Sequence, residues 1–314
     1  MILTIKVDMM EIKSEKKYDV IIIGGGYSGL SAALALGRSL RSVLIIDAGE
    51  PCNKQTPHSH NFLTQDGNTP SEILRIAKEQ LKKYATIEFY NGFASQGKKI
   101  NSGFEIKTSS QDLFYSKKII FASGIKDIKP DIKGFKDCWA ISVIHCPYCH
   151  GYEFKEQRTA IYTNNVQSAM HMVALVHNLT KKLTIIANDN FKLEEEQLKK
   201  LDSQKIEVIN SNIVEINHDK GYLNKVVLEN GKILELDAIY ASLPFEQHSN
   251  IPFQINCLHN EDGFITVDEF QKTTIDGAYA CGDNTTRMRS VANAVFTGNL
   301  AGVMVNMDLA NKEF

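Results

Sequence analysis

The chain has 314 residues, of which 43% are hydrophobic and 23% are charged, a composition typical of globular proteins and long enough for two domains. Lysine and arginine number 35 against 37 aspartates and glutamates, so no overall basic field exists to attract nucleic acid. The apolar run at residues 1–5 is too short for a signal peptide, and no apolar stretch approaches the ~18 residues of a membrane helix. We therefore expect a cytoplasmic protein without nucleic-acid or membrane partners, in which the six cysteines are reduced unless they carry out chemistry.

The first part of the chain has the pattern of a nucleotide-binding fold. Residues 18–23 form an apolar run that ends at three glycines, apolar residues then recur at helical spacing up to Gly37, and residues 42–46 form a second run. This order predicts the opening unit of a doubly wound α/β domain. Further on we expect a helix capped by Ser71, a small antiparallel sheet and a buried strand, at 71–84, at 87–90, 103–107 and 112–115, and at 118–122. Residues 1–17 are expected to form an extra strand or a loose arm.

A second unit of the same kind begins at Thr159. Its pattern predicts strands at 159–163, 183–187 and 238–241 and helices at 166–178 and 192–202. Asn230-Gly231 predicts a hairpin, and a last strand at 278–280 is followed by a long helix after Arg289. The predicted fold class is α/β: a doubly wound domain formed by residues 1–125 and 246–314, split by an inserted, smaller Rossmann-like domain at 126–245 that carries a C-x-x-C pair.

Gly24, Gly26 and Gly29 form the spacing G-x-G-x-x-G between the first strand and its helix. Such glycines allow a tight turn, let the backbone approach a pyrophosphate and bring helix and strand close, while the helix N-terminus meets the phosphate charge. Asp47 ends the next strand, where an acidic side chain commonly binds ribose hydroxyls. A glycine triplet alone can be only a turn, but strand, helix and acid in this order predict dinucleotide binding.

Two more glycine turns follow predicted strands. Gly282-Asp283 could direct a carboxylate at the ribityl or phosphate part of a cofactor, and Gly124, in Ala122-Ser123-Gly124, could mark a chain crossing in a flavin domain. Each is an ordinary turn when taken alone.

The segment Cys146-Pro147-Tyr148-Cys149-His150 carries two thiols separated by two residues. A structural zinc site needs four ligands in most cases, and the chain has no second C-x-x-C pair. The C-x-x-C-H string also matches covalent haem attachment, which leaves the nucleotide motif unexplained. A redox-active pair explains both motifs, because a flavin exchanges two electrons with a disulfide, so we favour this interpretation and expect no metal.

The histidines and the other cysteines allow two interpretations each. His150 follows the pair directly and can move the protons that thiol–disulfide exchange releases, or it can be a packing residue. Loop histidines are commonly solvated, and scattered cysteines are commonly small core residues. These sets are His58 and His60, and Cys52, Cys138, Cys257 and Cys281.

In this order the motifs resemble those of the thioredoxin reductase family of flavoprotein disulfide reductases, from about residue 18 to the end. The resemblance is carried by the glycine turn with Ser28, by Asp47, Asn61, Gly124, Cys146-Pro147-Tyr148-Cys149, Gly282-Asp283 and Arg289-Ser290-Val291. It implies that the split domain binds FAD, with Asn61, Asp283, Ser290 and Val291 at the cofactor, and that the inserted domain carries the cysteines and an NADPH site. It also implies a homodimer.

The chain departs from this family at two places. Where reductases have an acidic residue after the second cysteine, this chain has His150, and Cys146 to Glu153 is more similar to the C-P-[FY]-C-H-G-[YF]-E of dithiol oxidases of gliotoxin and holomycin biosynthesis. Residues 163–169 lack the glycine-rich turn, and residues 187–190 lack the His-Arg-Arg-type cluster that grips a 2′-phosphate. We therefore predict that NADPH is a poor electron donor.

The function expected from the resemblance is FAD-dependent thiol–disulfide exchange, with Cys149 near the flavin, Cys146 facing the substrate and His150 as acid and base. The substrate is a small dithiol oxidised with oxygen as acceptor, or a thioredoxin-like protein reduced with electrons from a ferredoxin-like donor. Two alternatives stay open: an ordinary NADPH-dependent thioredoxin reductase and a non-catalytic flavin redox sensor.

Overall fold

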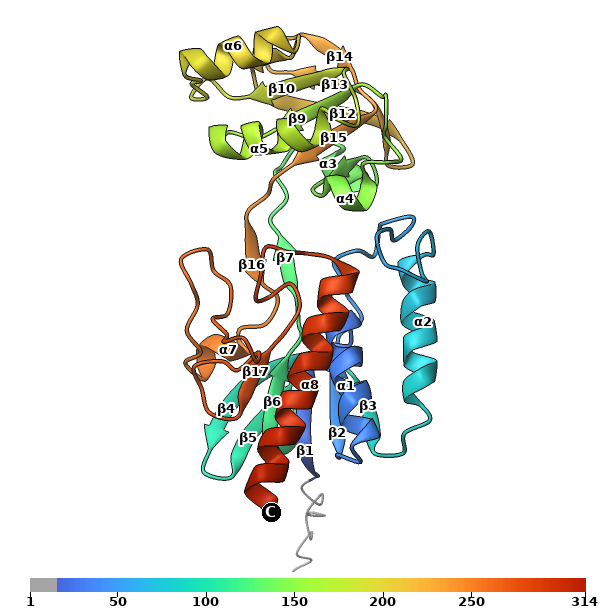
Figure 1. Ribbon diagram of the computed structural model, residues 1–314, viewed down its shortest axis with the longest axis vertical. Helices are drawn as coiled ribbons and strands as arrows, with labels where there is room; N and C mark the ends of the chain where they lie inside the picture. Colours follow the sequence, from blue (N-terminus) through green and yellow to red (C-terminus); the bar gives the residue numbers. More distant parts are fainter. Residues whose placement is uncertain (1–15) are drawn as a thin grey trace, which may run out of the picture.

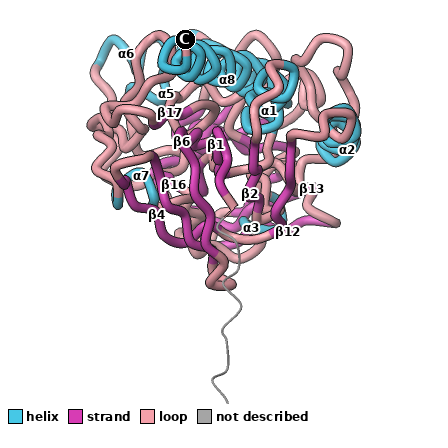
Figure 2. Tube along the Cα trace, turned by 90° about the horizontal axis from the view of Figure 1, so that it is seen from below, coloured by secondary structure: helices cyan, strands magenta, loops and turns pink. Residues whose placement is uncertain are grey.

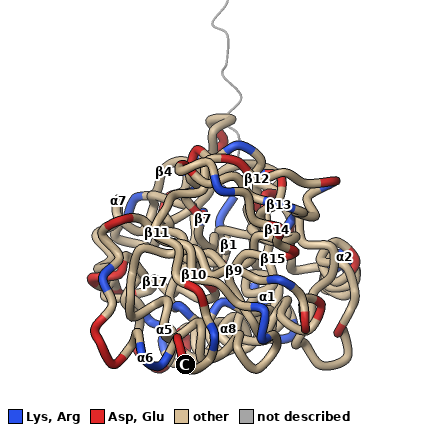
Figure 3. The backbone as a smooth tube through the Cα atoms, turned by 90° about the horizontal axis from the view of Figure 1, so that it is seen from above, with Lys and Arg blue, Asp and Glu red and all other residues tan. Residues whose placement is uncertain are grey.

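The structure, a computed structural model, describes residues 16–314, so most of the strand or arm expected at residues 1–17 lies outside the described residues. Two α/β units lie one above the other in Figure 1 and are joined by a pair of strands. We call them the large unit, which contains both ends of the described chain, and the small unit. Basic and acidic residues are interspersed along both (Figure 3).

The large unit is built on a seven-stranded sheet in the order β3-β2-β1-β6-β5-β4, with β17 beside β6. Its strands are β1 (Lys17–Ile23), β2 (Val43–Asp47), β3 (Ile87–Asn91), β4 (Ala94–Ile100), β5 (Gly103–Thr108), β6 (Leu113–Phe121) and β17 (Ala278–Ala280). The strands β1, β2, β3, β6 and β17 run parallel, and β4, β5 and β6 form an antiparallel meander. The central strands are buried on both faces, which explains their continuous apolar runs.

Helices α1 (Tyr27–Arg38) and α8 (Val291–Glu313) lie side by side on one face of this sheet (Figures 1 and 2). They cross at glycines: a Cβ added at Gly298 would lie 2.1 Å from the Ser28 carbonyl oxygen. The two backbones therefore touch, and this contact fixes the N-terminus of α8 beside the N-terminus of α1. The large unit also contains α2 (Pro70–Leu81) and α7 (Ile251–Gln254).

The small unit contains a five-stranded parallel sheet in the order β11-β10-β9-β15-β8 and a three-stranded antiparallel sheet. The parallel strands are β8 (Val143–Ile144), β9 (Thr159–Tyr162), β10 (Leu183–Ala187), β11 (Glu207–Asn210) and β15 (Ala238–Ala241). The antiparallel strands are β12 (Ile213–Asp219), β13 (Tyr222–Leu228) and β14 (Ile233–Glu235). The helices are α3 (Phe135–Cys138), α4 (Pro147–His150), α5 (Val166–Val176) and α6 (Glu195–Ser203). The connection between the units is the antiparallel pair β7 (Ile125–Asp127) and β16 (Phe245–Gln247).

Three local predictions need correction. Residues 87–91 form β3, which pairs in parallel with β2 and belongs to the main sheet. As a partly exposed edge strand it contains no fully buried residue, so its sequence lacks the continuous apolar run of the central parallel strands and suggested an antiparallel strand instead. The segments at 112–115 and 118–122 are one strand, β6. The cap of α2 is Thr69 and not Ser71, because Pro70 takes the first helical position and the Thr69 hydroxyl accepts the Glu72 N–H.

The hairpin predicted at Asn230-Gly231 is confirmed, since β13 and β14 pair across it and Gly231 has a φ of 82°. Among residues 16–314, no helix is both long enough and apolar enough to cross a membrane.

Candidate functional site

A cleft of about 810 Å³ is lined by residues of both units. The large unit contributes the turn after β1, the end of β2, the loop before α2 and the N-terminal end of α8. The small unit contributes Trp139, His145, Cys149 and His150. In Figure 1, α4 lies on the side of the small unit that faces the large unit. The predicted nucleotide turn and the predicted redox turn therefore meet in one cavity.

The glycine turn has no room for a Cβ atom at Gly24 and Gly29, where it packs against the rest of the large unit. It has open space at Gly26, which lines the cleft. A Cβ at Gly24, whose φ is 108°, would lie 2.3 Å from the Ala122 carbonyl oxygen, and one at Gly29 would lie 1.9 Å from the Gly24 carbonyl oxygen. A Cβ at Gly26 would meet nothing within 4 Å. Gly29 thus does not line the cleft but lets α1 approach the turn, and Gly26 leaves the N-terminus of α1 open to a ligand.

Asp47 lies at the end of β2 in the same cleft, as predicted for a ribose-binding acid. Its carboxylate accepts hydrogen bonds from the Lys78 ammonium at 3.3 Å and from the Gly49 N–H at 3.3 Å. The contact with Lys78 anchors the carboxylate between β2 and α2.

Asp283 lies opposite, within a buried charged cluster. Arg289 donates two hydrogen bonds to Asp127, at 2.8 and 3.0 Å, and its Nε lies 3.6 Å from an Asp283 oxygen. Burial raises the pKa of Asp283 above its usual range. The Asp283 carboxyl is therefore held at the cleft wall by a guanidinium that is already engaged with a second carboxylate.

Four other predicted residues support this wall. Ser28 lies under the Gly282 turn, where a Cβ on Gly282 would come within 2.6 Å of its hydroxyl oxygen. Ser290 caps α8 by accepting the Asn293 N–H at 3.1 Å, and Val291 is the first residue of that helix. Gly124 has a φ of 66° and lies where the chain leaves the large sheet.

Cys146 and Cys149 lie at the two ends of the first turn of α4, and the structure holds both as free thiols. A hydrogen bond from the Cys149 thiol is the largest of the effects that lower the pKa of Cys146 to about 7, and the same interaction raises the pKa of Cys149. Cys149 lines the cleft, whereas Cys146 does not. The pair is thus divided into a thiol at the cleft and a more acidic partner that does not line it.

His150 lines the cleft beside Cys149, and both of its ring nitrogens are buried without a hydrogen-bond partner among the described residues. Burial lowers the pKa of His150, so the ring is neutral near pH 7. A neutral, unpartnered imidazole next to a thiol is free to accept its proton.

Besides Gly29 and Cys146, Asn61 is a predicted site residue that does not line the cleft. It is exposed, with a φ of 59°, and its N–H is bonded to Asp66 at 2.7 Å. Conversely, Asp127, His60 and His145 line the cleft but were not among the predicted site residues. The solvated interpretation of His60 overlooked its place in the cleft wall, the adjacency of His145 to Cys146 was a signal that could have found it, and no local pattern marked Asp127. Nor do three or more histidine, cysteine or acidic side chains cluster as a metal site within residues 16–314.

The residues present fit a flavin dinucleotide. The turn at Gly26 offers open backbone next to a helix N-terminus, Asp47 offers a carboxylate at the end of β2, and Asp283 and Cys149 lie along the same cavity. Bound there, FAD would supply a two-electron carrier beside the dithiol.

A dinucleotide-binding α/β fold with a dithiol in the cofactor cleft defines a flavoprotein that exchanges electrons with thiols. The chain matches the pyridine nucleotide-disulphide oxidoreductase family over residues 18–298 and belongs to it. The thioredoxin reductase tcpT of Claviceps purpurea is 29% identical over 307 residues, covering 93% of this chain and 94% of that protein.

Two solved structures share the fold. The putative thioredoxin reductase TrxB of Bacillus anthracis has a TM-score of 0.90 and 29% identity, covering 95% of this chain and 100% of that one. HlmI has a TM-score of 0.88 and 24% identity, covering 95% and 94%, which shows similarity of fold alone. The predicted fold class and the resemblance to thioredoxin reductases are confirmed. The protein is an FAD-binding oxidoreductase of the thioredoxin reductase type that acts on disulfides.

Proposed function

We propose that this enzyme oxidises small dithiols to disulfides with oxygen as the final acceptor, and that it does not use NADPH efficiently. In this proposal residues 1–125 and 246–314 hold FAD, and residues 126–245 carry the redox cysteines on a degenerate dinucleotide-binding domain. The observation that carries it is the turn between β9 and α5, whose backbone donors are already bound by side chains of this chain.

Two backbone N–H groups at this turn, and one just after the neighbouring strand β10, have partners within the chain. The Asn165 side chain accepts the Ser168 N–H at 2.8 Å and caps α5, and the Asn164 side chain accepts the Asn188 N–H at 2.9 Å. The Thr163 hydroxyl accepts the Asn165 N–H at 3.2 Å. A pyrophosphate bound at this helix N-terminus would have to displace these bonds, whereas a glycine-rich turn leaves its donors free.

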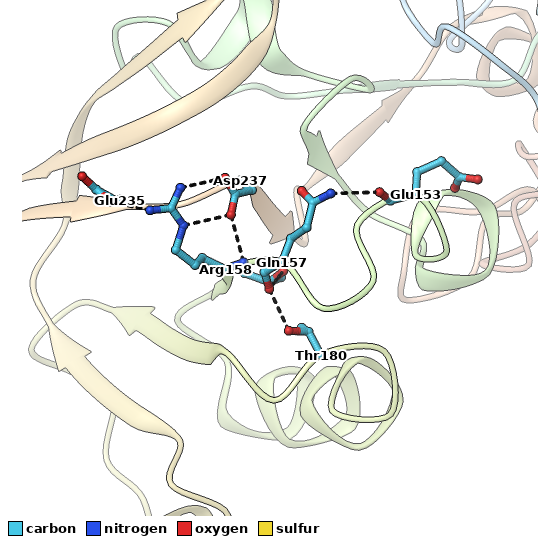
Figure 4. A network of polar contacts seen from close by, with 7 residues as sticks. Glu153, Gln157, Arg158, Thr180, Glu235 and Asp237 are labelled. Atoms are coloured by element: carbon cyan, nitrogen blue, oxygen red, sulfur yellow. Dashed lines mark hydrogen bonds and ion pairs between the residues drawn. The ribbon is translucent and has the colours of Figure 1, made fainter.

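The small unit also has no arginine beside this turn for a 2′-phosphate. Its single arginine, Arg158, precedes β9 and so lies at the opposite end of that strand from the turn. Figure 4 shows the guanidinium between two carboxylates: Asp237, at 2.8 and 2.9 Å, and Glu235. Near the turn the chain instead offers Asp189, which repels a phosphate. Two missing charge-assisted hydrogen bonds, at about 1.5–3 kcal/mol each, weaken NADPH binding by roughly 10²-fold or more.

The proposed thiol chemistry follows from the different pKa values and positions of Cys146 and Cys149. A substrate thiolate attacks the Cys146–Cys149 disulfide at Cys146, forming a mixed disulfide and releasing Cys149 as a thiolate toward the cleft. The second substrate thiolate then attacks the mixed disulfide, which yields the substrate disulfide and the Cys146 thiolate. His150 accepts the protons that the substrate thiols lose. Overall, one dithiol and one oxygen molecule become one disulfide and one hydrogen peroxide.

The test is a pair of assays on the purified yellow protein. We expect a dithiol such as dithiothreitol to bleach the flavin in the absence of oxygen and to yield hydrogen peroxide in its presence, and Cys146→Ser to abolish both. We expect micromolar NADPH to leave the flavin oxidised. Rapid bleaching by NADPH contradicts the proposal and restores an ordinary thioredoxin reductase. If the wild type turns over no dithiol, the remaining interpretation is a non-catalytic flavin redox sensor.

A second candidate is reduction of a thioredoxin-like protein with electrons from a ferredoxin-like donor. It is favoured by the names of the relatives, which include thioredoxin reductases of Claviceps purpurea and Bacillus anthracis. Reduction of thioredoxin by the photochemically reduced enzyme, without peroxide release from dithiols, would select this direction. A cytoplasmic location is part of both proposals.

We also propose a homodimer. The outward face of α8 carries Phe296, Val303 and Met307, which are 63%, 48% and 48% exposed. Their spacing of seven and four residues places them in one stripe along the helix. An exposed apolar stripe on a long helix is self-complementary across a two-fold axis, which suits a second copy of the chain.

A further inference from the structure

His150 has no direct exchange of protons with water. Both ring nitrogens are shielded from solvent, and neither has a hydrogen-bond partner among the described residues. A proton that the ring takes from a thiol must therefore leave through a neighbouring group that does reach solvent. Without such a group, the base would be protonated once and then remain blocked.

Glu153 and His60 lie where such a neighbour is needed. Glu153 follows α4 in the small unit, and His60 lies in the loop before α2 in the large unit and lines the cleft with His150. The His60 Nε2 is 3.5 Å from a Glu153 oxygen, and its Nδ1 is 3.5 Å from an Asp66 oxygen. The side chains of Glu153, His60 and Asp66 are 40%, 21% and 65% exposed, so each of them reaches water.

The other titratable groups near His150 do not offer this path. Cys146 and Cys149 are the thiols whose chemistry the ring serves. His145 is stacked on Trp139, with ring centroids 6.1 Å apart, and burial, followed by the charge of Arg289, lowers its pKa to about 3. Glu153 and His60 lie close enough to His150 for their charges to act on its pKa, can carry a proton and reach solvent.

The geometry points to Glu153 and His60 as positioning residues that act through His150, forming the path by which its proton reaches water. This inference rests on the proposed function. When a substrate thiol gives its proton to His150, its sulfur bonds to Cys146 and the Cys146–Cys149 bond breaks. The proton then passes by way of Glu153 and His60 to solvent, which returns His150 to its neutral form for the second thiol. One residue of the path comes from each unit, so the path exists only when the units face each other as they do here.

The decisive measurement needs no turnover. In the oxidised holoenzyme labelled with ¹⁵N-histidine, the exchange of the His150 ring N–H with water is measured by NMR, with His150→Gln to assign the signal. We expect Glu153→Gln and His60→Asn each to slow this exchange about tenfold or more. The same variants are expected to lower kcat for dithiol oxidation by about 10- to 100-fold, within the range of acid–base catalysis. Formate or imidazole in the buffer should restore kcat in the variants and leave the wild type unchanged.

Two matched controls separate proton transfer from structure. His218→Asn removes a histidine that pairs with Asp137 at the same 3.5 Å but lies away from the cleft, and Glu156→Gln removes a carboxylate from the loop that carries Glu153. Both should behave as wild type.

Unchanged ring exchange in Glu153→Gln and His60→Asn overturns the inference, whatever their turnover. If the two substitutions slow the ring exchange but the wild-type protein oxidises no dithiol, the proton path is upheld and the proposed function is rejected. The two failures are therefore distinguishable.

Discussion

At the scale of the residue, the two thiols of α4 differ in pKa because they share one hydrogen bond. The Cys149 thiol donates to Cys146, so Cys146 carries the negative charge of the reduced pair while Cys149 keeps its proton. Since the pKa of Cys146 is lowered to about 7, its thiolate forms as the pH rises through that value and is lost below it. The residue proposed to exchange with substrate is therefore reactive at neutral pH.

This asymmetry predicts an order of alkylation. In the anaerobically reduced protein, iodoacetamide should modify Cys146 before Cys149, with a rate that rises with pH and levels off above neutrality. Cys149→Ala removes the donor and should move the midpoint toward the pKa of an ordinary thiol. Mass spectrometry after timed quenching over a series of pH values checks both results, and first labelling at Cys149 would contradict them.

The ion pair of Arg289 with Asp127 predicts a large effect of one substitution on stability. Their side chains are 16% and 5% exposed, so Arg289→Gln leaves a buried carboxylate unpaired and should lower the free energy of unfolding by about 3–5 kcal/mol. Arg287→Gln is the matched control, because Arg287 is 74% exposed and its pair with Asp262 contributes about 1 kcal/mol or less. Urea unfolding followed by circular dichroism measures the difference. Equal midpoints for the two variants would show that the buried pair adds nothing.

At the scale of the element, two glycines near the start of α1 are expected to differ in role: Gly26 serves cofactor binding, whereas Gly29 serves folding. Gly26→Ala places a methyl group in open space, at a φ of −77° that alanine adopts freely, so the protein should fold with normal stability but bind less flavin. Gly29→Ala drives a methyl group into the Gly24 carbonyl and should destabilise the fold by about 1–3 kcal/mol or more. The ratio of flavin to protein absorbance and the unfolding of the flavin-free protein distinguish the two effects. Normal flavin content in Gly26→Ala would argue against cofactor binding at this turn.

Elements could be predicted from the sequence where burial and local geometry dictate the residues. The strands β1, β2 and β6 are buried and gave apolar runs, and the glycine turn is local. The edge strand β3 was misassigned because none of its residues is fully buried, so its sequence lacks a continuous apolar run. The pair of Asp127 with Arg289 joins residues 162 positions apart, and the contact of His60 with Glu153 joins two units. No local pattern encodes such contacts, because they depend on how distant segments of the chain fold together at the cleft.

At the scale of the whole molecule, the large unit forms most of the cofactor cleft and the small unit supplies the thiols, with β7 and β16 between them. The small unit keeps the parallel sheet of a dinucleotide-binding domain, yet its turn is closed by its own asparagines. Whether or not this unit binds a second nucleotide, it holds Cys149 and His150 against the cleft.

The exposed stripe on α8 predicts the state of assembly. Two charges at Val303 and Met307 should disrupt association, because an isologous interface repeats each substitution on both copies. We expect light scattering to give twice the monomer mass of 35.2 kDa for the wild type and the monomer mass for Val303→Glu with Met307→Glu. Ile233→Glu, at a site 57% exposed in the small unit, is the control and should remain dimeric. A monomeric wild type, or a doubly charged variant that stays dimeric, would exclude this face as the interface. Flavin content should not change, because these side chains point away from the cleft.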